Sequence, residues 1–341
     1  MGNGSSPRDS LFQLNTLVWA SFPQPSGSPV TPVLRNAGYV LYAIEQPLTA
    51  SVAEAAQLKR LRLDVQPNPV ADAVLHNQDK NAYVLVECKP SSFGPDSYEC
   101  PQARGMIVAG ANVASRLGLS RNSVSEVCYL VPAGDAGQTD ATLLSLLNQV
   151  SGHGLAGCPT GVVGLFLKPD GVYLGLEARL GGKASMPLQL IPQQLVVSRA
   201  PDQDPRPLYV IPWIPDAQDG ADLAAFKEKV RVVLLSWLGK TPVGSPVLPF
   251  EEVLHDVTRG VFRQWADKQS LLGRVLPTLE KLVRSLFGDD IRANIGRRQV
   301  SALIESDKDR EELMERVRTA ALPERLPKGI QLPLQNEDAA Q

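Results

Sequence analysis

Hydrophobic and polar positions predict a mixture of strands and helices up to about residue 205, and almost only helices after it. Before that point, short apolar runs bounded by turn residues predict strands. The expected strands are residues 82–89, 124–132 and a hairpin over 161–177. Apolar positions at helical spacing predict helices over 32–46, 51–62, 102–117 and 140–150. Strands and helices interleaved in this way predict a mixed α/β sheet, because each kind of element must bury its apolar face against the other.

The later part of the chain has helical periodicity almost throughout. Prolines recur between residues 187 and 220, which is typical of a connection or an extended wrapping segment. Helices are expected over residues 221–238, 250–268, 271–287, 292–304 and 307–321. The predicted organisation is a flexible or docking N-terminal arm over 1–30, an α/β domain over 31–205, an all-helical C-terminal domain over 206–322 and a polar tail over 323–341.

Composition narrows the classes of protein that fit. The net charge is -2 and the pI is about 6.0, so bulk positive charge does not draw the chain to nucleic acid. No apolar run reaches the roughly 20 residues that cross a bilayer, and the first residues lack the layout of a secretory signal. We therefore expect a cytoplasmic protein with no membrane partner.

Cysteine and histidine spacing does not favour a metal centre built from these residues. The four cysteines, at positions 88, 100, 128 and 158, have no C-x-x-C spacing. Small core thiols are favoured over an iron–sulfur cluster. The three histidines, at 76, 153 and 255, also lack paired spacing, which favours turn or surface positions over a metal cluster.

The most informative pattern is a carboxylate before a turn and a Glu-x-Lys at the end of an apolar strand. Because side chains alternate across a strand, Glu87 and Lys89 point to one face, and a hairpin returns Asp72 beside them. Asp72, Glu87 and the backbone carbonyl of Cys88 are suitable oxygen ligands for Mg²⁺ or Mn²⁺. Lys89 would orient an attacking water and stabilise the transition state. Gln102, which opens the next helix, would hold the water or a phosphate oxygen.

Asp72, fourteen further residues and then Glu87-Cys88-Lys89 resemble the PD-(D/E)XK nuclease superfamily, over residues 32–135. The resemblance implies a restriction-endonuclease-like core and a metal-dependent nuclease. It implies that the Asp and the Glu bind metal, that the Lys assists catalysis and that an acidic residue from the preceding helix sometimes joins them. Glu45 or Glu54 would match that last role.

The chain departs from the pattern of this superfamily at two positions. Pro69 lies three residues before Asp72 rather than next to it, at a position that varies in the family. Gln102 is followed four residues later by Met106, where the exonuclease branch has Tyr. Membership of the exonuclease or CRISPR-associated branch is therefore not inferred.

Residues 258–298 carry nine Lys or Arg against four Asp or Glu. They predict two alternatives, a phosphate-binding surface or the solvated faces of amphipathic helices. The candidate nucleic-acid contacts are Arg259, Arg263, Arg284, Arg297 and Arg298. The apolar stripes of the same helices suit an equally good alternative, a surface for a protein partner or for a homodimer.

The sequence favours a Mg²⁺-dependent nuclease that acts on DNA rather than RNA, in bacterial antiviral defence or in DNA repair. One alternative is a non-catalytic, nuclease-like scaffold that docks partner proteins in a larger complex. Another is an α/β enzyme that is not a nuclease, with Lys89 as a general base or a phosphate-binding group.

Overall fold

The computed structural model describes residues 6–61, 63–119, 123–175, 193–199, 203–212 and 220–321. The chain forms two compact units. The first comprises the residues up to Pro205 together with Gln264–Ala266, and the second comprises Arg206–Arg263 and the residues from Asp267. The expected polar tail over 323–341 lies outside the described residues.

A mixed sheet of seven strands forms the centre of the first unit's described part. Its strands lie side by side in chain order: β1 (Val40–Pro47), β2 (Val70–Asn77), β3 (Ala82–Cys88), β4 (Val124–Pro132), β5 (Thr160–Lys168), β6 (Gly171–Gly175) and β7 (Gln194–Ser198). The pairs β3–β4 and β4–β5 are parallel and the others are antiparallel. The predicted mixed α/β fold class is confirmed.

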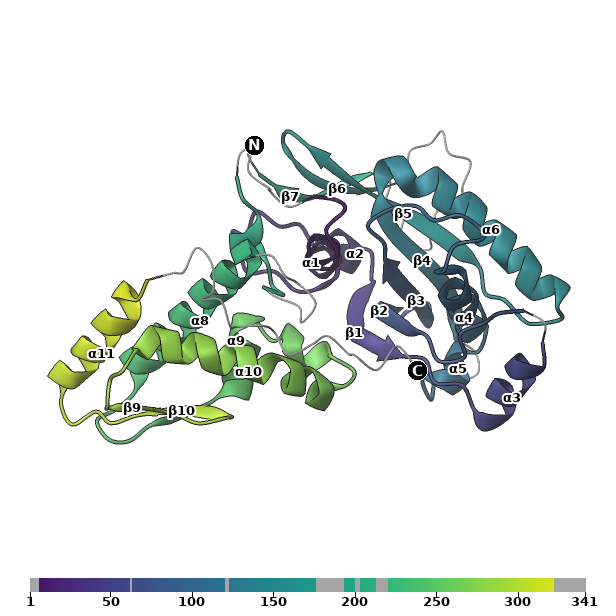
Figure 1. Ribbon diagram of the computed structural model, residues 1–341. Helices are drawn as coiled ribbons and strands as arrows, with labels where there is room; N and C mark the ends of the chain where they lie inside the picture. The colour runs from purple at the N-terminus through teal and green to yellow at the C-terminus, as the bar shows by residue number, and fades with distance from the viewer. Residues whose placement is uncertain are drawn as a thin grey trace. The chain divides into compact units, whose positions relative to one another are not determined.

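Helices lie on both faces of this sheet (Figure 1). The helices of the first unit's described part are α1 (Ser10–Ser21), α2 (Val33–Asn36), α3 (Val52–Arg60), α4 (Cys100–Ala111), α5 (Val113–Arg116) and α6 (Ala136–Gly152), with a short 3₁₀ turn at Ala133–Asp135. The helices α4 and α6 connect the parallel strands and cover one face, while α1 packs against β1, β2 and β3 on the other. Gly110 of α4 lies against Cys158 Sγ with no room for a Cβ, which explains the small residues of this helix.

The predicted helix over residues 32–46 is wrong in its longer part. Only Val33–Asn36 is helical, and Gly38, with φ +88°, precedes strand β1. The residues of β1 find backbone partners on β2, from Val40 opposite His76 to Pro47 opposite Val70. This ladder overrides the local helical pattern because strand preference depends on neighbouring strands. The proline-rich region likewise contains a regular element, strand β7.

The expectation of a flexible or docking arm over residues 1–30 is wrong for Ser10–Ser21, which form helix α1. Asp9 caps α1 by accepting hydrogen bonds from the backbone N–H groups of Leu11 and Phe12, and every residue of α1 after Ser10 is buried. Apolar side chains lie on every side of this helix, among the buried polar residues Gln13, Asn15, Thr16 and Ser21, so it shows no single hydrophobic stripe. A helix of that kind needs cover on every side, and α1 therefore belongs to the core of the first unit.

The second unit is mainly helical in its described part. Its helices are α8 (Gly220–Lys240), α9 (Phe250–Val257), α10 (Lys268–Phe287) and α11 (Asp307–Thr319), with 3₁₀ turns at Arg206–Leu208 and Val261–Gln264. No helix in the described residues is long and apolar enough to cross a membrane.

The second unit also contains a small antiparallel sheet, so the prediction of an all-helical domain is wrong in part. Its strands follow the order β8 (Val247–Pro249), β10 (Gln299–Ala302) and β9 (Ala293–Ile295). The expected helix over 292–304 is thus a hairpin, because β10 finds a backbone partner on each side. The expected helix over 250–268 ends at Val257, where Arg259 and Gly260 both adopt positive φ.

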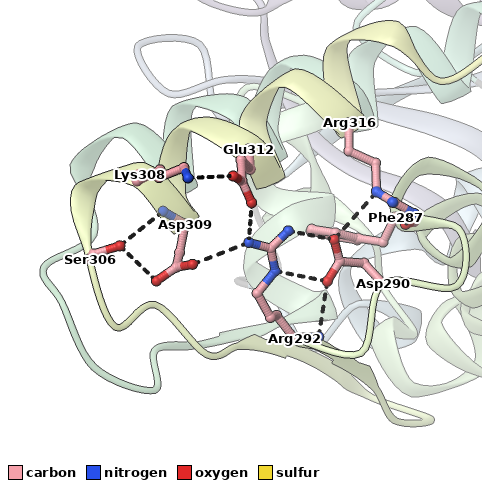
Figure 2. Close-up of polar contacts among 8 residues, drawn as sticks. All are labelled: Phe287, Asp290, Arg292, Ser306, Lys308, Asp309, Glu312 and Arg316. Atoms are coloured by element: carbon pink, nitrogen blue, oxygen red, sulfur yellow. Dashed lines mark hydrogen bonds and ion pairs between the residues drawn. The ribbon is translucent and has the colours of Figure 1, made fainter.

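A network of ion pairs joins α11 to the segment that follows α10 (Figure 2). Arg292 contacts Asp290 at 2.8 Å, Glu312 at 2.8 Å and Asp309 at 3.3 Å. Arg316 lies 3.3 Å from Asp290. The Arg292 cluster comprises these five residues. Hydrogen bonds from Arg292 lower the pKa of Asp290, and hydrogen bonds from Ser306 and Arg292 lower the pKa of Asp309. The charges therefore stabilise one another.

Candidate functional site

Carboxylates of three neighbouring strands meet near the end of the β2–β3 hairpin. Ala73 pairs with Val86, and continuing this antiparallel register by one residue sets Asp72 opposite Glu87. Ile44 pairs with Ala73 in the same way, so Glu45 of β1 follows beside Asp72. Side-chain alternation directs Glu87 to the face that α4 covers, with Tyr83 and Leu85.

The predicted lysine and glutamine complete this group of side chains. Lys89 Nζ lies 3.2 Å from Glu87 Oε1, 3.4 Å from Gln102 Oε1 and 3.9 Å from Glu99 Oε1. Gln102 Nε2 donates to Glu87 Oε1 at 2.9 Å. Asp72 Oδ2 accepts a hydrogen bond of 2.7 Å from the backbone N–H of Cys88. The structure thus brings together Asp72, Glu87, Lys89 and Gln102, and with Glu99 they form the Lys89 cluster.

Negative charge exceeds positive charge within the Lys89 cluster. Burial and the neighbouring Asp72 raise the pKa of Glu87 to about 8, although Lys89 and Gln102 act in the opposite direction. Burial also raises the pKa of Asp72, and the charge of Glu45 adds to the rise. The hydrogen bond from the Cys88 N–H and the charge of Lys89 lower this pKa, but by less. Burial alone would lower the pKa of Lys89, but its acidic neighbours raise it by more. The ammonium is therefore firmly charged, and the two carboxyls compete for it.

The donor set can be tested against a divalent cation. Glu87 Oε2 is buried and has no hydrogen-bond partner among the described residues, so a buried acceptor is left unsatisfied. Mg²⁺ is commonly bound through one or two carboxylates and keeps several waters. Asp72 and Glu87 meet that requirement. The described residues contain no group of three or more His, Cys, Asp or Glu arranged for a metal ion. A cation here would therefore depend on these two acids, backbone oxygen and water.

The two candidates for an additional acid have different environments. Glu54 of α3 lies 2.6 Å from Arg116 Nη2 and accepts a hydrogen bond of 3.1 Å from Asn112, so its carboxylate is engaged by residues outside the Lys89 cluster. The Arg116 side chain is only 1% exposed, and a buried guanidinium holds its carboxylate partner strongly. Glu45 lies close enough to influence Asp72, but it comes from a strand rather than a helix. Its φ of +49° is strained for a residue other than glycine.

Sequence reasoning missed the roles of Glu99 and Gln13. Glu99 is the residue before α4, and the signal that could have placed it is Pro101 in the first turn of that helix. Gln13 Nε2 of α1 donates a hydrogen bond of 2.7 Å to the backbone carbonyl of Lys89. That contact spans 76 positions of sequence, and no local pattern indicates it.

The candidate nucleic-acid contacts lie in the second unit. Arg284 is held by Glu280 at 2.9 Å and by the carbonyl of Ile295 at 2.6 Å. The other four arginines are exposed and come from two turns, with Arg259 and Arg263 after α9 and Arg297 and Arg298 between β9 and β10. The four cysteines are buried, as the sequence predicted, and none of them forms a disulfide with another.

Comparisons with protein-family models, with curated proteins and with solved structures find no match to this chain. The resemblance to the PD-(D/E)XK superfamily therefore stays a prediction. It depends on the residues of the Lys89 cluster.

Proposed function

We propose that the protein is a metal-dependent nuclease that hydrolyses phosphodiester bonds, with DNA as its substrate. The observation that carries this proposal is the pair of competing carboxyls, Asp72 and Glu87, beside the ammonium of Lys89. Groups with perturbed pKa values cluster at functional sites because catalytic acids, bases and ligands need pKa values that suit their task. A divalent cation supplies the missing positive charge.

The residues divide the work of phosphodiester hydrolysis as follows. Asp72, Glu87 and the carbonyl of Cys88 would hold Mg²⁺ or Mn²⁺, which would supply an activated water and positive charge beside the phosphate. Glu87, with a pKa of about 8, retains a proton near neutral pH and gives it up when a cation is held. Lys89 orients the attacking water and stabilises charge on the phosphate. Gln102 fixes Glu87 through one amide atom and Lys89 through the other.

The second unit supplies the substrate contacts in this proposal. Arg259, Arg263, Arg297 and Arg298 are exposed and project from turns, where guanidinium groups reach phosphates readily. The proposal assigns the activity to the cytoplasm, in bacterial defence or DNA repair. A protein partner or a second copy would bind through the same unit.

A non-catalytic scaffold is the second candidate function. The sequence suggested it partly through an apolar N-terminal arm that would dock partners. Helix α1 is buried within the first unit, so this support is lost. The buried Oε2 of Glu87, which has no hydrogen-bond partner among the described residues, reduces stability and therefore favours a catalytic role over a scaffold.

Cleavage assays with a matched pair of lysine variants test the proposal. Single- and double-stranded DNA and RNA are incubated with Mg²⁺ or Mn²⁺ and the wild type, Lys89→Met or Lys80→Met. Lys80 follows the β2 strand in the hairpin turn and lies outside the cluster. Lys89→Met should reduce kcat by about 10²- to 10³-fold, the usual cost of losing one charge-stabilising donor. Lys80→Met should cleave normally. Absence of cleavage by the wild type, or equal activity in both variants, refutes the proposal.

A further inference from the structure

The N-terminal segment of the chain is tied to the backbone of Lys89. The side-chain amide of Gln13 donates one hydrogen bond to the carbonyl of Lys89 and a second to the carbonyl of Pro7, each at 2.7 Å. Gln13 is fully buried in α1. Both of its acceptors are carbonyl oxygens, so the nitrogen of the amide must face them.

These bonds fix Lys89 at the point where β3 ends. The N–H of Lys89 donates to the carbonyl of Leu130 on β4 at 2.9 Å, and its carbonyl accepts from Gln13. Arg8 adds a contact of 3.4 Å to the carbonyl of Pro90 and an ion pair of 3.2 Å with Asp135. Both backbone groups of Lys89 are thus held, the N–H by β4 and the carbonyl by α1.

The burial of Gln13 is difficult to explain by stability alone. Its Oε1 is buried and has no hydrogen-bond partner among the described residues. An unsatisfied buried acceptor reduces stability, and the other residues that α1 buries are mostly apolar. A polar side chain retained in such a place is expected where it serves a site.

We infer that Gln13 is a positioning residue, which holds the ammonium of Lys89 in place by fixing the backbone from which the side chain extends. The inference deepens the proposed function and rests on it for its catalytic consequence. Its structural consequence is independent of any substrate. Without Gln13, the end of β3 relaxes and the ammonium leaves its distance of 3.2 Å from Glu87.

The test compares three variants by two readouts. Gln13→Met keeps length and volume but removes both donors, and Gln13→Glu turns a carboxylate toward two carbonyl oxygens. Gln24→Met is the control, because Gln24 also donates to two backbone carbonyls, those of Trp19 and Phe22, near the end of the same helix. The first readout is kcat and KM for cleavage with Mn²⁺. The second is the rate at which acetic anhydride acetylates Lys89, followed by mass spectrometry across a pH series.

Gln13→Met should lower kcat by about tenfold and leave KM and the Kd of Mn²⁺ within about twofold, because the carboxylates keep their own supports. Lys89 should be acetylated several times faster than in the wild type. Gln13→Glu should lower kcat more than Gln13→Met does, and it should accelerate the acetylation of Lys89 more. Gln24→Met should match the wild type in both readouts. If the wild type cleaves no substrate, the proposed function fails while the acetylation rates still decide the role of Gln13.

The inference is overturned if Gln13→Met leaves the acetylation profile of Lys89 unchanged, or if Gln24→Met changes it equally. Arg8→Met covers the case in which neither Gln13 variant folds. The Arg8 side chain is 61% exposed, so its loss spares the core. Arg8→Met should also accelerate the acetylation of Lys89, by a smaller factor than Gln13→Met. An unchanged rate in Arg8→Met likewise contradicts the inference.

Discussion

The two units each contain a cluster of charged side chains, and the two clusters differ in how their charges are balanced. In the Arg292 cluster, two guanidinium groups serve three carboxylates, and the pKa values of Asp290 and Asp309 are lowered (Figure 2). In the Lys89 cluster, one ammonium serves three carboxylates, and the pKa values of Asp72 and Glu87 are raised. The first arrangement stabilises the fold. The second holds charge that a ligand can neutralise.

The number of cationic partners accounts for much of the difference. The Asp290 side chain is 4% exposed, and two guanidinium groups pair with it, Arg292 at 2.8 Å and Arg316 at 3.3 Å. The Glu87 side chain is also 4% exposed, but it has one ammonium as its partner, and its charged form loses the hydration that an exposed carboxylate keeps. A carboxyl in that position is protonated or paired with a cation. The comparison therefore predicts different responses to mutation, to pH and to metal.

The largest expected effect is a gain of stability together with a loss of activity in Glu87→Gln. Its pKa of about 8 lies above that of an unfolded carboxyl, so the native protein binds the extra proton between those two values. Stability of the metal-free wild type should then fall as pH rises through this window, by up to about 1.4 kcal/mol per pH unit. Glu87→Gln should lack that fall and lose cleavage by about 10³-fold or more. Urea unfolding over a pH series measures the first effect.

Asp309→Asn is the control for Glu87→Gln in the other cluster. It should keep full cleavage activity and lose stability, because the lowered pKa of Asp309 marks a carboxylate that the fold stabilises. A Glu87→Gln protein that unfolds more readily than the wild type at pH 8 would place Glu87 among structural carboxylates.

The second prediction concerns the coupling of metal and proton. Because Glu87 must lose its proton to bind a cation, the affinity for Mn²⁺ should rise by up to about tenfold per pH unit below pH 8 and level off above it. Calorimetry in two buffers of different ionisation enthalpy counts the proton released. An affinity that does not depend on pH contradicts the assignment of Glu87 as a ligand.

The third prediction removes the centre of the Arg292 cluster. Arg292→Leu should lower Tm by a few degrees, since the partly exposed pairs contribute on the order of 1 kcal/mol. The stabilisation by Asp290 and Asp309 should be lost in the wild type as pH falls through their lowered pKa values. Binding of Mn²⁺ should not change. Thermal unfolding and a Mn²⁺ titration of the same sample show whether the two clusters are independent.

The smallest effect is expected for Glu54→Gln. Its carboxylate serves Arg116, so activity should stay within about twofold of the wild type while stability falls. Glu45→Gln is the matched variant, and it should reduce activity by about tenfold because Glu45 influences Asp72. Equal activity losses in steady-state kinetics would show that the structure does not separate these two acids.

Local sequence patterns were sufficient to predict which side chains lie at the centre of the candidate site. Strand alternation predicted that Glu87 and Lys89 share a face, the hairpin predicted the return of Asp72, and a helix start predicted Gln102. Burial of the run before Glu87 was also readable, since it is apolar on both faces.

The elements around the site could not be predicted from local sequence patterns, because their structure depends on contacts with distant parts of the chain. Strand β1 has a helical local pattern and becomes a strand only beside β2. Helix α1 shows no amphipathic stripe, and the bond from Gln13 to Lys89 joins residues that no periodicity relates. The salt bridge between Glu54 and Arg116 likewise joins two helices that are separate in sequence.

A crystal soaked in Mn²⁺ and measured at the manganese absorption edge tests the central claim most directly. The account predicts an anomalous peak bound by Asp72, Glu87 and the carbonyl of Cys88, and no peak at the Arg292 cluster. The distances from the metal to oxygen should be about 2.2 Å, near those of other small divalent cations. Absence of a peak at Asp72 and Glu87, under conditions where Mn²⁺ is in large excess and the pH is above 8, would contradict it.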